Sequence, residues 1–471
     1  MRPLIPQEFL LARGSAAPED LLASLRARFE IAETETEESR QIFWDTFDWR
    51  LFKAGLQLVE RPGGGGRELV WGGESGEPRG RLELPASFEG GLAEDLPEEL
   101  RALAKPLSMR RLLPILRVRT AGSRIRVLGE ESKTVARLRV LRAFAARDAS
   151  SPEHALVPRL LVEPVRGYRA EEAAVLDHLG SACQLERPAA SLFEAALEAL
   201  GRRPGDYSSK VALVLEPGQS ALDTACSIYR ALLDAMVVNE PGMRQDLDSE
   251  FLHDFRVAVR RTRSALSQIR GVFAEDVLLH FKQEFAWLGG ITGPTRDLDV
   301  YRLKIPVYRR ELPDEAARDL EPLETFLARR QKQEQRRLVE ALDTERYRDL
   351  LETWSRQIQN PAAGPAAESP ALELASARIW RLYRRIRKRG LAIDDDTPAA
   401  ALHEVRIMGK KLRYLLEFFR SLYPQGPVGS AIRELKRLQD NLGDFNDYEV
   451  QQLALQGFAE DLLKAEGGDP A

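Results

Sequence analysis

One basic motif occurs twice in this chain, 150 residues apart, as LHDFRVAVRRTRSAL and LHEVRIMGKKLRYLL. Each copy holds one histidine followed by four cations. These are His253, Arg256, Arg260, Arg261 and Arg263 in the first copy, and His403, Arg406, Lys410, Lys411 and Arg413 in the second. Guanidinium and ammonium groups bind oxyanions, so the repeated chemistry is anion binding.

The repeat extends beyond this motif. Ala221, Leu222 and Ala225 recur as Ala371, Leu372 and Ala375, and Gly293, Asp297 and Val300 recur as Gly443, Asp447 and Val450. A constant offset over about 80 residues indicates an internal duplication.

Helical spacing predicts that most of these cations share a face in each copy. At about 100° per residue, the predicted basic faces are His253, Arg256, Arg260 and Arg263, and His403, Arg406, Lys410 and Arg413. The apolar stripes beside them are Leu252, Phe255, Val259 and Leu266, and Leu402, Val405, Leu412 and Leu416. Arg261 is expected to project away from the basic face.

Acidic residues near the two motifs are too few to balance this charge. Residues 253–270 hold five arginines against Asp254, and residues 403–420 hold five cations against Glu404 and Glu417. For one such helix, a solvated surface is the ordinary explanation. Two uncompensated faces in one chain, where like charges repel, favour a polyanionic partner.

The length, net charge and cysteine content of the chain restrict the classes of protein and partner that it fits. A chain of 471 residues can hold two or three domains, and its net charge of -4 argues against a general nucleic-acid coat. Cys183 and Cys226 lack metal-ligand spacing and fit a reducing compartment. Without a long apolar run or a signal peptide, the chain is expected to be soluble and cytoplasmic, with no membrane partner.

The predicted secondary structure changes along the chain. Residues 1–185 mix predicted strands (Gln57–Glu60, Ile115–Val118, Ser123–Leu128, Lys133–Leu141, Leu156–Glu163) with predicted helices (Leu21–Phe29, Glu171–Leu179). This predicts an antiparallel α+β domain or barrel. Residues 186–217 are a connector with a short helix. Residues 218–465 are predicted to be all-α, with repeats at about 218–359 and 371–460 and a linker between them.

Metal chemistry is not predicted for the motif histidines. Neither His253 nor His403 has a second histidine or a carboxylate at i+3 or i+4, so zinc is disfavoured. A neutral histidine can donate to a phosphate oxygen, and a buried structural histidine is the alternative. Two roles, metal binding or pairing with arginines, are left open for four further acidic residues, Asp297, Asp299, Asp447 and Glu449. No cofactor is expected.

Polyphosphate and nucleic acid would both satisfy the charge pattern. Single-stranded nucleic acid also needs exposed aromatics for base stacking, and the two motif faces carry none except Tyr414 at a face edge. Inorganic polyphosphate is therefore preferred and nucleic acid disfavoured. Further cations on helices that could face the same groove are Lys304, Arg329, Arg336 and Arg384.

Residues from about 218 to 460 resemble the CHAD domain, the conserved histidine α-helical domain. The resemblance is carried by Asn239-Glu240, His253-Asp254-x-Arg256-Val257-Ala258-x-Arg260-Arg261, Arg296-Asp297-x-Asp299-Val300, His403-x-x-Arg406, Lys410-Lys411-Leu412-Arg413-Tyr414 and Leu438-Gln439-Asp440-x-Leu442-Gly443. It implies two helical bundles related by pseudo-twofold symmetry, with basic helices lining a central groove or pore. It also implies binding of inorganic polyphosphate there, without catalysis.

Residues 1–185 resemble the CYTH domain, a triphosphate-tunnel fold. The matching segments are Asp45-Thr46-x-Asp48, Arg117-Val118-Arg119-Thr120 and Val162-Glu163-Pro164. Active members begin with an ExExK strand that holds a divalent metal, which favours carboxylate ligands. Here that stretch is Pro6-Gln7-Glu8-Phe9-Leu10, with one carboxylate and no lysine.

These departures imply a degenerate domain without activity. The overall prediction is a non-catalytic polyphosphate-binding protein, with polyphosphate granules as a candidate location. The alternative is a metal-dependent triphosphatase or polyphosphatase that acts through the CYTH-like domain.

Overall fold

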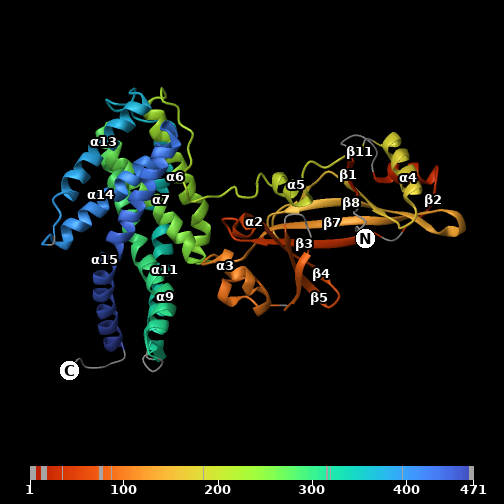
Figure 1. Ribbon diagram of the computed structural model, residues 1–471, viewed down its shortest axis with the longest axis horizontal. Helices are drawn as coiled ribbons and strands as arrows, with labels where there is room; N and C mark the ends of the chain where they lie inside the picture. Colours follow the sequence, from red (N-terminus) through yellow and green to blue (C-terminus); the bar gives the residue numbers. More distant parts are fainter. Residues whose placement is uncertain are drawn as a thin grey trace. The chain divides into compact units, whose positions relative to one another are not determined.

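The fold comprises two compact units, Met1–Ser208 and Ser209–Ala471. In this computed structural model the described residues are 7–11, 18–33, 36–73, 78–85, 87–183, 185–313, 317–318, 320–394 and 396–465. Figure 1 shows a sheet at the centre of the first unit and helices throughout the second. Among the described residues, no helix combines the length and apolar character that a membrane span requires.

The first unit is built on an antiparallel sheet. Its strands are β1 (Gln7–Leu11), β2 (Glu30–Glu33), β3 (Glu37–Asp45), β4 (Leu56–Gly63), β5 (Gly66–Gly73), β6 (Pro78–Leu84), β7 (Leu113–Leu128), β8 (Thr134–Ala146), β9 (His154–Ala155), β10 (Arg159–Pro164) and β11 (Leu185–Glu186). The order is β11-β1-β10-β8-β7-β3-β4-β5-β6, with β2 paired to β7 and β9 to β8. The predicted antiparallel α+β class is confirmed.

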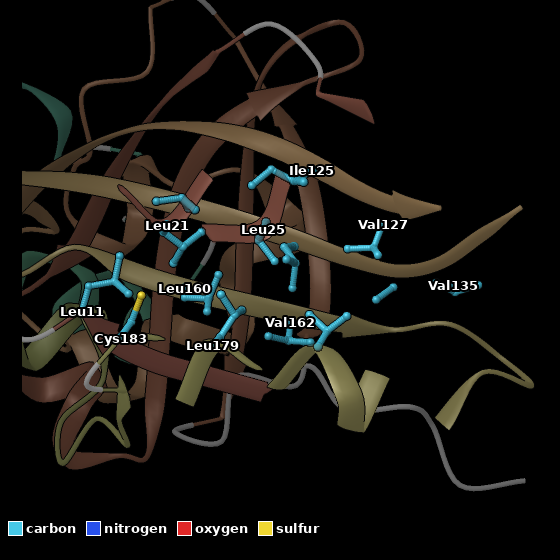
Figure 2. Close-up of a cluster of buried hydrophobic side chains, with 14 residues drawn as sticks. Leu11, Leu21, Leu25, Ile125, Val127, Val135, Leu160, Val162, Leu179 and Cys183 are labelled. Carbon is cyan, nitrogen blue, oxygen red and sulfur yellow. The ribbon is translucent and has the colours of Figure 1, made fainter. Parts of the chain in front are cut away.

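Helices pack on this sheet through apolar side chains. The helices of this unit are α1 (Pro18–Arg26), α2 (Arg50–Lys53), α3 (Ala104–Leu107), α4 (Arg169–Ala182) and α5 (Leu192–Ala199), with short 3-10 turns η1 (Ala93–Asp95), η2 (Glu98–Leu103) and η3 (Glu130–Ser132). Figure 2 shows Leu21 and Leu25 of α1 and Leu179 of α4 against Ile125 of β7 and Leu160 of β10. The two predicted helices and several of the predicted strands therefore share this core, while other predicted strands contribute to separate apolar clusters.

The two predicted helices are present with shifted ends. The helix predicted at Leu21–Phe29 is α1, which ends at Arg26. It stops there because the chain from Glu30 pairs with β7 as β2. The helix predicted at Glu171–Leu179 lies within α4.

The second unit is all-α, as predicted. Its helices are α6 (Ala221–Arg244), α7 (Ser249–Gln268), α8 (Glu275–Ile291), α9 (Gly293–Glu311), α11 (Glu321–Leu342), α12 (Glu345–Gln359), α13 (Ala371–Gly390), α14 (Ala399–Phe418) and α15 (Gln425–Ala465), with η4 (Arg420–Leu422). The linker between the copies bonds to the loop after α7, where Gly364 N donates to Val272 O at 2.8 Å.

The duplication is visible in where helices begin. Helices α13, α14 and α15 begin 150 residues after α6, α7 and α8. At the start of α6 and α13 the main chains exchange equivalent bonds, because Ala221 N donates to Ser369 O and Ala371 N donates to Gln219 O, both at 2.8 Å. Residue i bonding residue j while the equivalent of i bonds the equivalent of j is the signature of a twofold axis. The two copies are therefore related by a pseudo-twofold axis, as the resemblance implied.

Candidate anion-binding site

The two motif helices, α7 and α14, are held in place by their apolar sides. In α7 the stripe of Leu252, Phe255, Val259 and Leu266 is buried, and in α14 Val405, Leu412 and Leu416 are buried. Leu402, near the start of α14, is only half-buried. Asp248 caps α7 by accepting from Glu250 N at 2.9 Å and Phe251 N at 3.3 Å. Burial of one side of each helix leaves its polar side to line a cavity.

That cavity is a pocket of about 810 Å³ to which both motif helices contribute. Its cations are Lys210, Arg260, Arg261, Arg263, Arg406, Lys410, Lys411 and Arg413, joined by His253. The carboxylates in the lining are Asp254 and Asp440. Eight cations against two carboxylates give the pocket a strongly positive potential, since field lines concentrate in a concave surface.

The lining is paired across the pseudo-twofold axis. Positions that differ by 150 residues contribute together: Val257 with Ile407, Arg260 with Lys410, Arg261 with Lys411, Arg263 with Arg413, and Ser264 with Tyr414. The pocket therefore straddles the axis and belongs to both copies. The structure brings His253, Arg260, Arg263, Arg406, Lys410 and Arg413 together from the predicted set.

Glu417 of α14 ties two of these arginines to the fold. Arg261 Nη2 donates to Glu417 Oε2 at 2.7 Å, and Arg413 Nη1 donates to Glu417 Oε1 at 3.0 Å. Arg261 also donates to Ser209 O at 3.1 Å and is buried. The expectation that Arg261 projects away from the basic face is wrong, because its long side chain reaches between the helices to this carboxylate. Its charge is largely compensated there.

Arg256 does not have the role that helical spacing predicted for it. It does not line the pocket. Its Nη1 donates to Gly289 O at 3.2 Å and to Thr292 Oγ1 at 3.0 Å, at the C-terminal end of α8. A cation there complements the helix dipole. Burial, followed by repulsion from Arg260, lowers the pKa of Arg256.

The other predicted cations also lie outside the pocket lining. His403 is exposed in the first turns of α14. Lys304 is on α9 and Arg329 and Arg336 are on α11, two helices that share a core with the end of α15. Arg384, on α13, lines a different pocket. Their part in anion binding stays a prediction.

The predicted acidic residues make other contacts. Gln331 Nε2 donates to Asp299 Oδ1 at 3.2 Å and to Asp246 at 3.3 Å. Burial, together with repulsion from Asp246, raises the pKa of Asp299 to about 7. Asp297 lies near Arg256 and Arg296, whose charges offset the effect of burial on its pKa, which is raised.

The side chains of Asp447 and Glu449 lie outside the described residues. Across the described part of the chain, no group of three or more His, Cys, Asp or Glu side chains could hold a metal ion.

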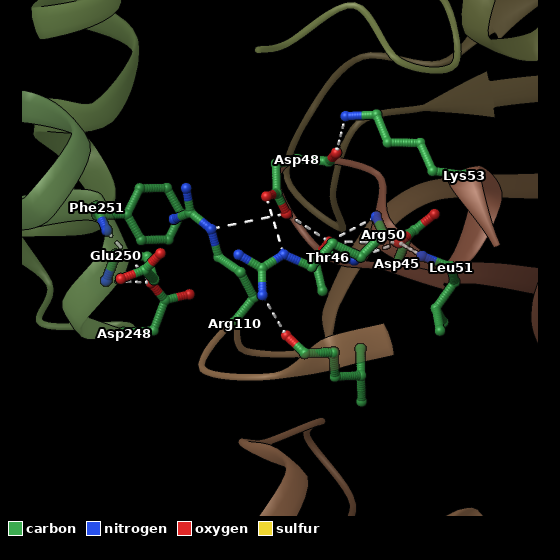
Figure 3. Close-up of polar contacts among 11 residues, drawn as sticks. Asp45, Thr46, Asp48, Arg50, Leu51, Lys53, Arg110, Asp248, Glu250 and Phe251 are labelled. Atoms are coloured by element: carbon green, nitrogen blue, oxygen red, sulfur yellow. Dashed lines mark hydrogen bonds and ion pairs between the residues drawn. The ribbon is translucent and has the colours of Figure 1, made fainter. Parts of the chain in front are cut away.

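In the first unit, the Asp45-Thr46-x-Asp48 segment closes the turn from β3 into α2 (Figure 3). Asp45 accepts from the backbone N–H groups of Leu51 and Phe52, both at 2.9 Å. Burial raises the pKa of Asp45 to about 6, against the lowering effect of these bonds. Arg50 Nε donates to Asp48 Oδ2 at 3.0 Å. Both carboxylates therefore stabilise a turn.

Glu8, the carboxylate kept in the first strand, is engaged by an arginine. Arg159 Nη1 donates to Glu8 Oε1 at 2.7 Å, and the Arg159 side chain is 4% exposed. A buried guanidinium held this closely competes with any metal for the carboxylate.

Two pocket residues outside the motif helices were not among the predicted site residues. Lys210 comes from the segment before the first repeat, and Gln439 of α15 accepts from Arg413 Nε at 3.0 Å. Lys210 has no repeated counterpart or periodic neighbours to mark it. Gln439 stood within a recognised motif, but only tertiary packing gives it a role.

The architecture is that of a two-unit protein with a duplicated helical domain and a cationic pocket on its pseudo-twofold axis. The CHAD domain family model matches residues 227–456. This match confirms the CHAD identification made from the repeated motifs. CHAD domains are associated with polyphosphate.

Relatives share part of this chain. Two uncharacterised proteins of Mycobacterium tuberculosis, from strains CDC 1551 / Oshkosh and H37Rv, are 27% identical to it over 274 residues. The alignment covers 54% of this chain and 50% of each relative. The chain thus spans about half the length of the curated relatives it matches.

Solved structures give low similarity scores. The CHAD domain from the plant Ricinus communis is 28% identical, with 55% of this chain and 88% of that chain covered and a TM-score of 0.45. The Hippeastrum protein HpAC1, described with a dominant triphosphatase activity, is 13% identical, with 43% of this chain and 99% of that chain covered and a TM-score of 0.25. Scores this low carry no information about function.

Proposed function

We propose that the CHAD domain of this chain binds long-chain inorganic polyphosphate in the pocket between α7 and α14, without catalysis. The observation that carries the proposal is the shared lining, in which two symmetry-related basic helices supply cations to one cavity. Arg260, Arg263 and Lys411 make no ion pair with a carboxylate of the described residues. They are the cations best placed for a ligand.

The symmetry of the pocket favours this ligand. A polyphosphate chain reads the same in both directions, so equivalent phosphates can meet equivalent cations on either side of a twofold axis. A nucleic-acid strand has a direction and cannot match a symmetric lining in this way. Arginine forks can each take two phosphate oxygens.

Aromatic side chains in this pocket are not available to bases. Tyr414 is buried, and the guanidinium groups of Arg261 and Arg413 lie 5.5 Å and 5.2 Å from its ring centroid. A ring already covered by two cations offers no free face for base stacking. The pocket therefore suits bare phosphates better than nucleotides.

A titration tests the proposal. The full chain would be titrated with end-labelled polyphosphate of defined length at about 50 and about 200 mM salt, where contacts to several phosphates predict a loss of affinity of about 100-fold. Unlabelled polyphosphate should displace the label, and an equal charge concentration of tripolyphosphate should displace it less. Binding that ignores salt, or equal displacement by both competitors, would contradict a site for long chains.

The absence of catalysis needs its own measurement. Phosphate release from tripolyphosphate and from long-chain polyphosphate would be followed with Mg²⁺ and with Mn²⁺. We expect none above a protein-free control, because the Glu8 carboxylate is held by Arg159. Release that disappears in Glu8→Ala would establish the alternative, a metal-dependent hydrolase. Cytoplasmic location and recruitment to polyphosphate granules belong to the same proposal, and co-sedimentation with isolated granules would test them.

A further inference from the structure

Helix α13 presents two exposed aromatic side chains on its outer side. Trp380 is 59% exposed and Tyr383 is 43% exposed. They are three residues apart, so they are neighbours on the helix surface. Their rings stack, with centroids 5.5 Å apart and planes 26° from parallel. Together the two exposed rings form an aromatic platform at the surface.

Cations share a pocket with the Trp380 ring of this platform. Trp380 lines a pocket of about 1100 Å³ together with Arg378, Arg381, Arg384, Arg385, Arg387 and Lys388. Glu373 is the carboxylate in this lining. Arg381, Arg384 and Arg387 make no ion pair with any described residue. Arg378 donates to Arg270 O at 2.7 Å, and burial and repulsion from Arg381 lower its pKa.

This surface is separate from the pocket between α7 and α14. The two linings share no described residue. The apolar side of α13 is already used in the fold, since Leu374, Leu382 and Ile386 are buried. The exposed aromatics are therefore additional to the residues that hold the helix in place.

The surface is also absent from the other copy. The α6 positions equivalent to Trp380 and Tyr383 are Arg230 and Leu233. Those equivalent to Arg381, Arg384, Arg385, Arg387 and Lys388 are Ala231, Asp234, Ala235, Val237 and Val238. The basic and aromatic face therefore arose, or was kept, in the second copy alone.

We propose that this outer face of α13 binds single-stranded nucleic acid. Guanidinium and ammonium groups attract the phosphates, and stacked rings accept bases, which single-stranded binding sites require. Bare polyphosphate would gain nothing from the rings. A helix that lies on a membrane inserts its apolar side, and here that side is buried in the fold.

Binding of a fluorescein-labelled uridine oligonucleotide of about twelve nucleotides, a length within single-strand site sizes, tests the proposal. The full chain at low salt is expected to bind it more tightly than a duplex of the same length. Trp380→Ala with Tyr383→Ala removes the platform and keeps every cation. It should weaken binding at least tenfold, because each stacked base contributes substantially. Trp380→Phe with Tyr383→Phe keeps two rings and should restore most of the affinity.

Two controls separate this site from the polyphosphate pocket. Arg260→Glu with Lys410→Glu should leave the oligonucleotide affinity within about threefold, a change typical of a distant, screened charge. The Trp380→Ala, Tyr383→Ala variant should in turn bind polyphosphate normally. Loss of oligonucleotide binding in the Arg260, Lys410 variant but not in the aromatic variant would overturn the proposal. So would an aromatic variant that loses binding to phosphatidylserine vesicles while keeping oligonucleotide binding.

Discussion

Reversing one cation on each motif helix is the sharpest test of the shared pocket. Arg260 and Lys410 occupy equivalent positions and both line the cavity. Arg260 is exposed and Lys410 is half-buried. Arg260 makes no ion pair with a described carboxylate. Arg260→Glu with Lys410→Glu therefore changes the charge that a ligand meets from both copies without removing core packing.

The expected loss follows from the exposure of these groups. For unit charges about 4 Å apart in water, each contact with a phosphate contributes about 1 kcal/mol. Reversal turns two attractions into two repulsions, so the binding free energy changes by about 4 kcal/mol, or about 1000-fold in affinity. Each single reversal should cost about half of this free energy. Deeper burial of the ligand would increase all three values, since the effective dielectric would be lower.

Fluorescence anisotropy of end-labelled polyphosphate measures this loss directly. Arg230→Glu with Arg348→Glu is the matched control, because it makes the same change in net charge at two exposed positions outside the pocket lining. We expect less than a tenfold effect from it, through screened long-range repulsion. If the control weakened binding as much as Arg260→Glu with Lys410→Glu, general attraction would explain the affinity. If the pocket variant bound normally, the pocket would be the wrong site.

Three further predictions concern stability. Arg261→Met removes one of the two ion pairs of Glu417, which stays paired with Arg413, and should lower the free energy of unfolding in urea by about 2 kcal/mol, with a smaller effect on polyphosphate affinity than Arg260→Glu. Because the pKa of Asp299 is raised to about 7, its protonated carboxyl favours the folded state. This contribution is complete at a pH below the ordinary aspartate pKa and is lost as the pH rises through 7. Asp299→Asn should therefore stabilise the protein at pH of about 8, by up to about 4 kcal/mol, and little at about pH 4; an equal effect at both would contradict this. Gly364→Ala should lower the melting temperature, since a Cβ would lie 2.4 Å from Phe273 O.

The sequence predicts which site residues share a helix face, but not which contacts they make with other helices. The 3.6-residue period placed Arg260 and Arg263 on one face of α7, and the repeat offset gave Lys410 and Arg413 the same positions on α14. These four residues do line one pocket. Helical periodicity carries no information about neighbouring helices. The carbonyl end of α8 takes Arg256 out of the pocket, while Glu417 of α14 draws Arg261 into its wall. Both roles depend on contacts between segments far apart in the sequence.

In the first unit, one long strand was predicted as two short ones. Ile115–Val118 and Ser123–Leu128 were predicted as separate strands, but they are one strand, β7, of 16 residues. Gly122 lies between them, and glycine weakens a strand pattern. A Cβ at Gly122 would lie 2.4 Å from Val140 O of β8. The glycine is thus needed for close approach of two paired strands and does not interrupt the strand.

Divergence between the copies suggests how one domain could serve two kinds of polyanion. On the pseudo-twofold axis, duplication brings equivalent cations together, and a ligand without direction can use both sets equally. Away from the axis, each copy is free to change alone, and α13 has cations and aromatics where α6 has Arg230, Leu233, Asp234 and a set of alanines and valines. A strand with a direction needs such an asymmetric surface. If polyphosphate and oligonucleotide bind at these two places, saturating one should leave the other open, so that the labelled oligonucleotide stays bound when polyphosphate fills the axial pocket. Complete displacement at a polyphosphate concentration that just fills one site would mean that both ligands share it, and the division between the copies would have no functional meaning.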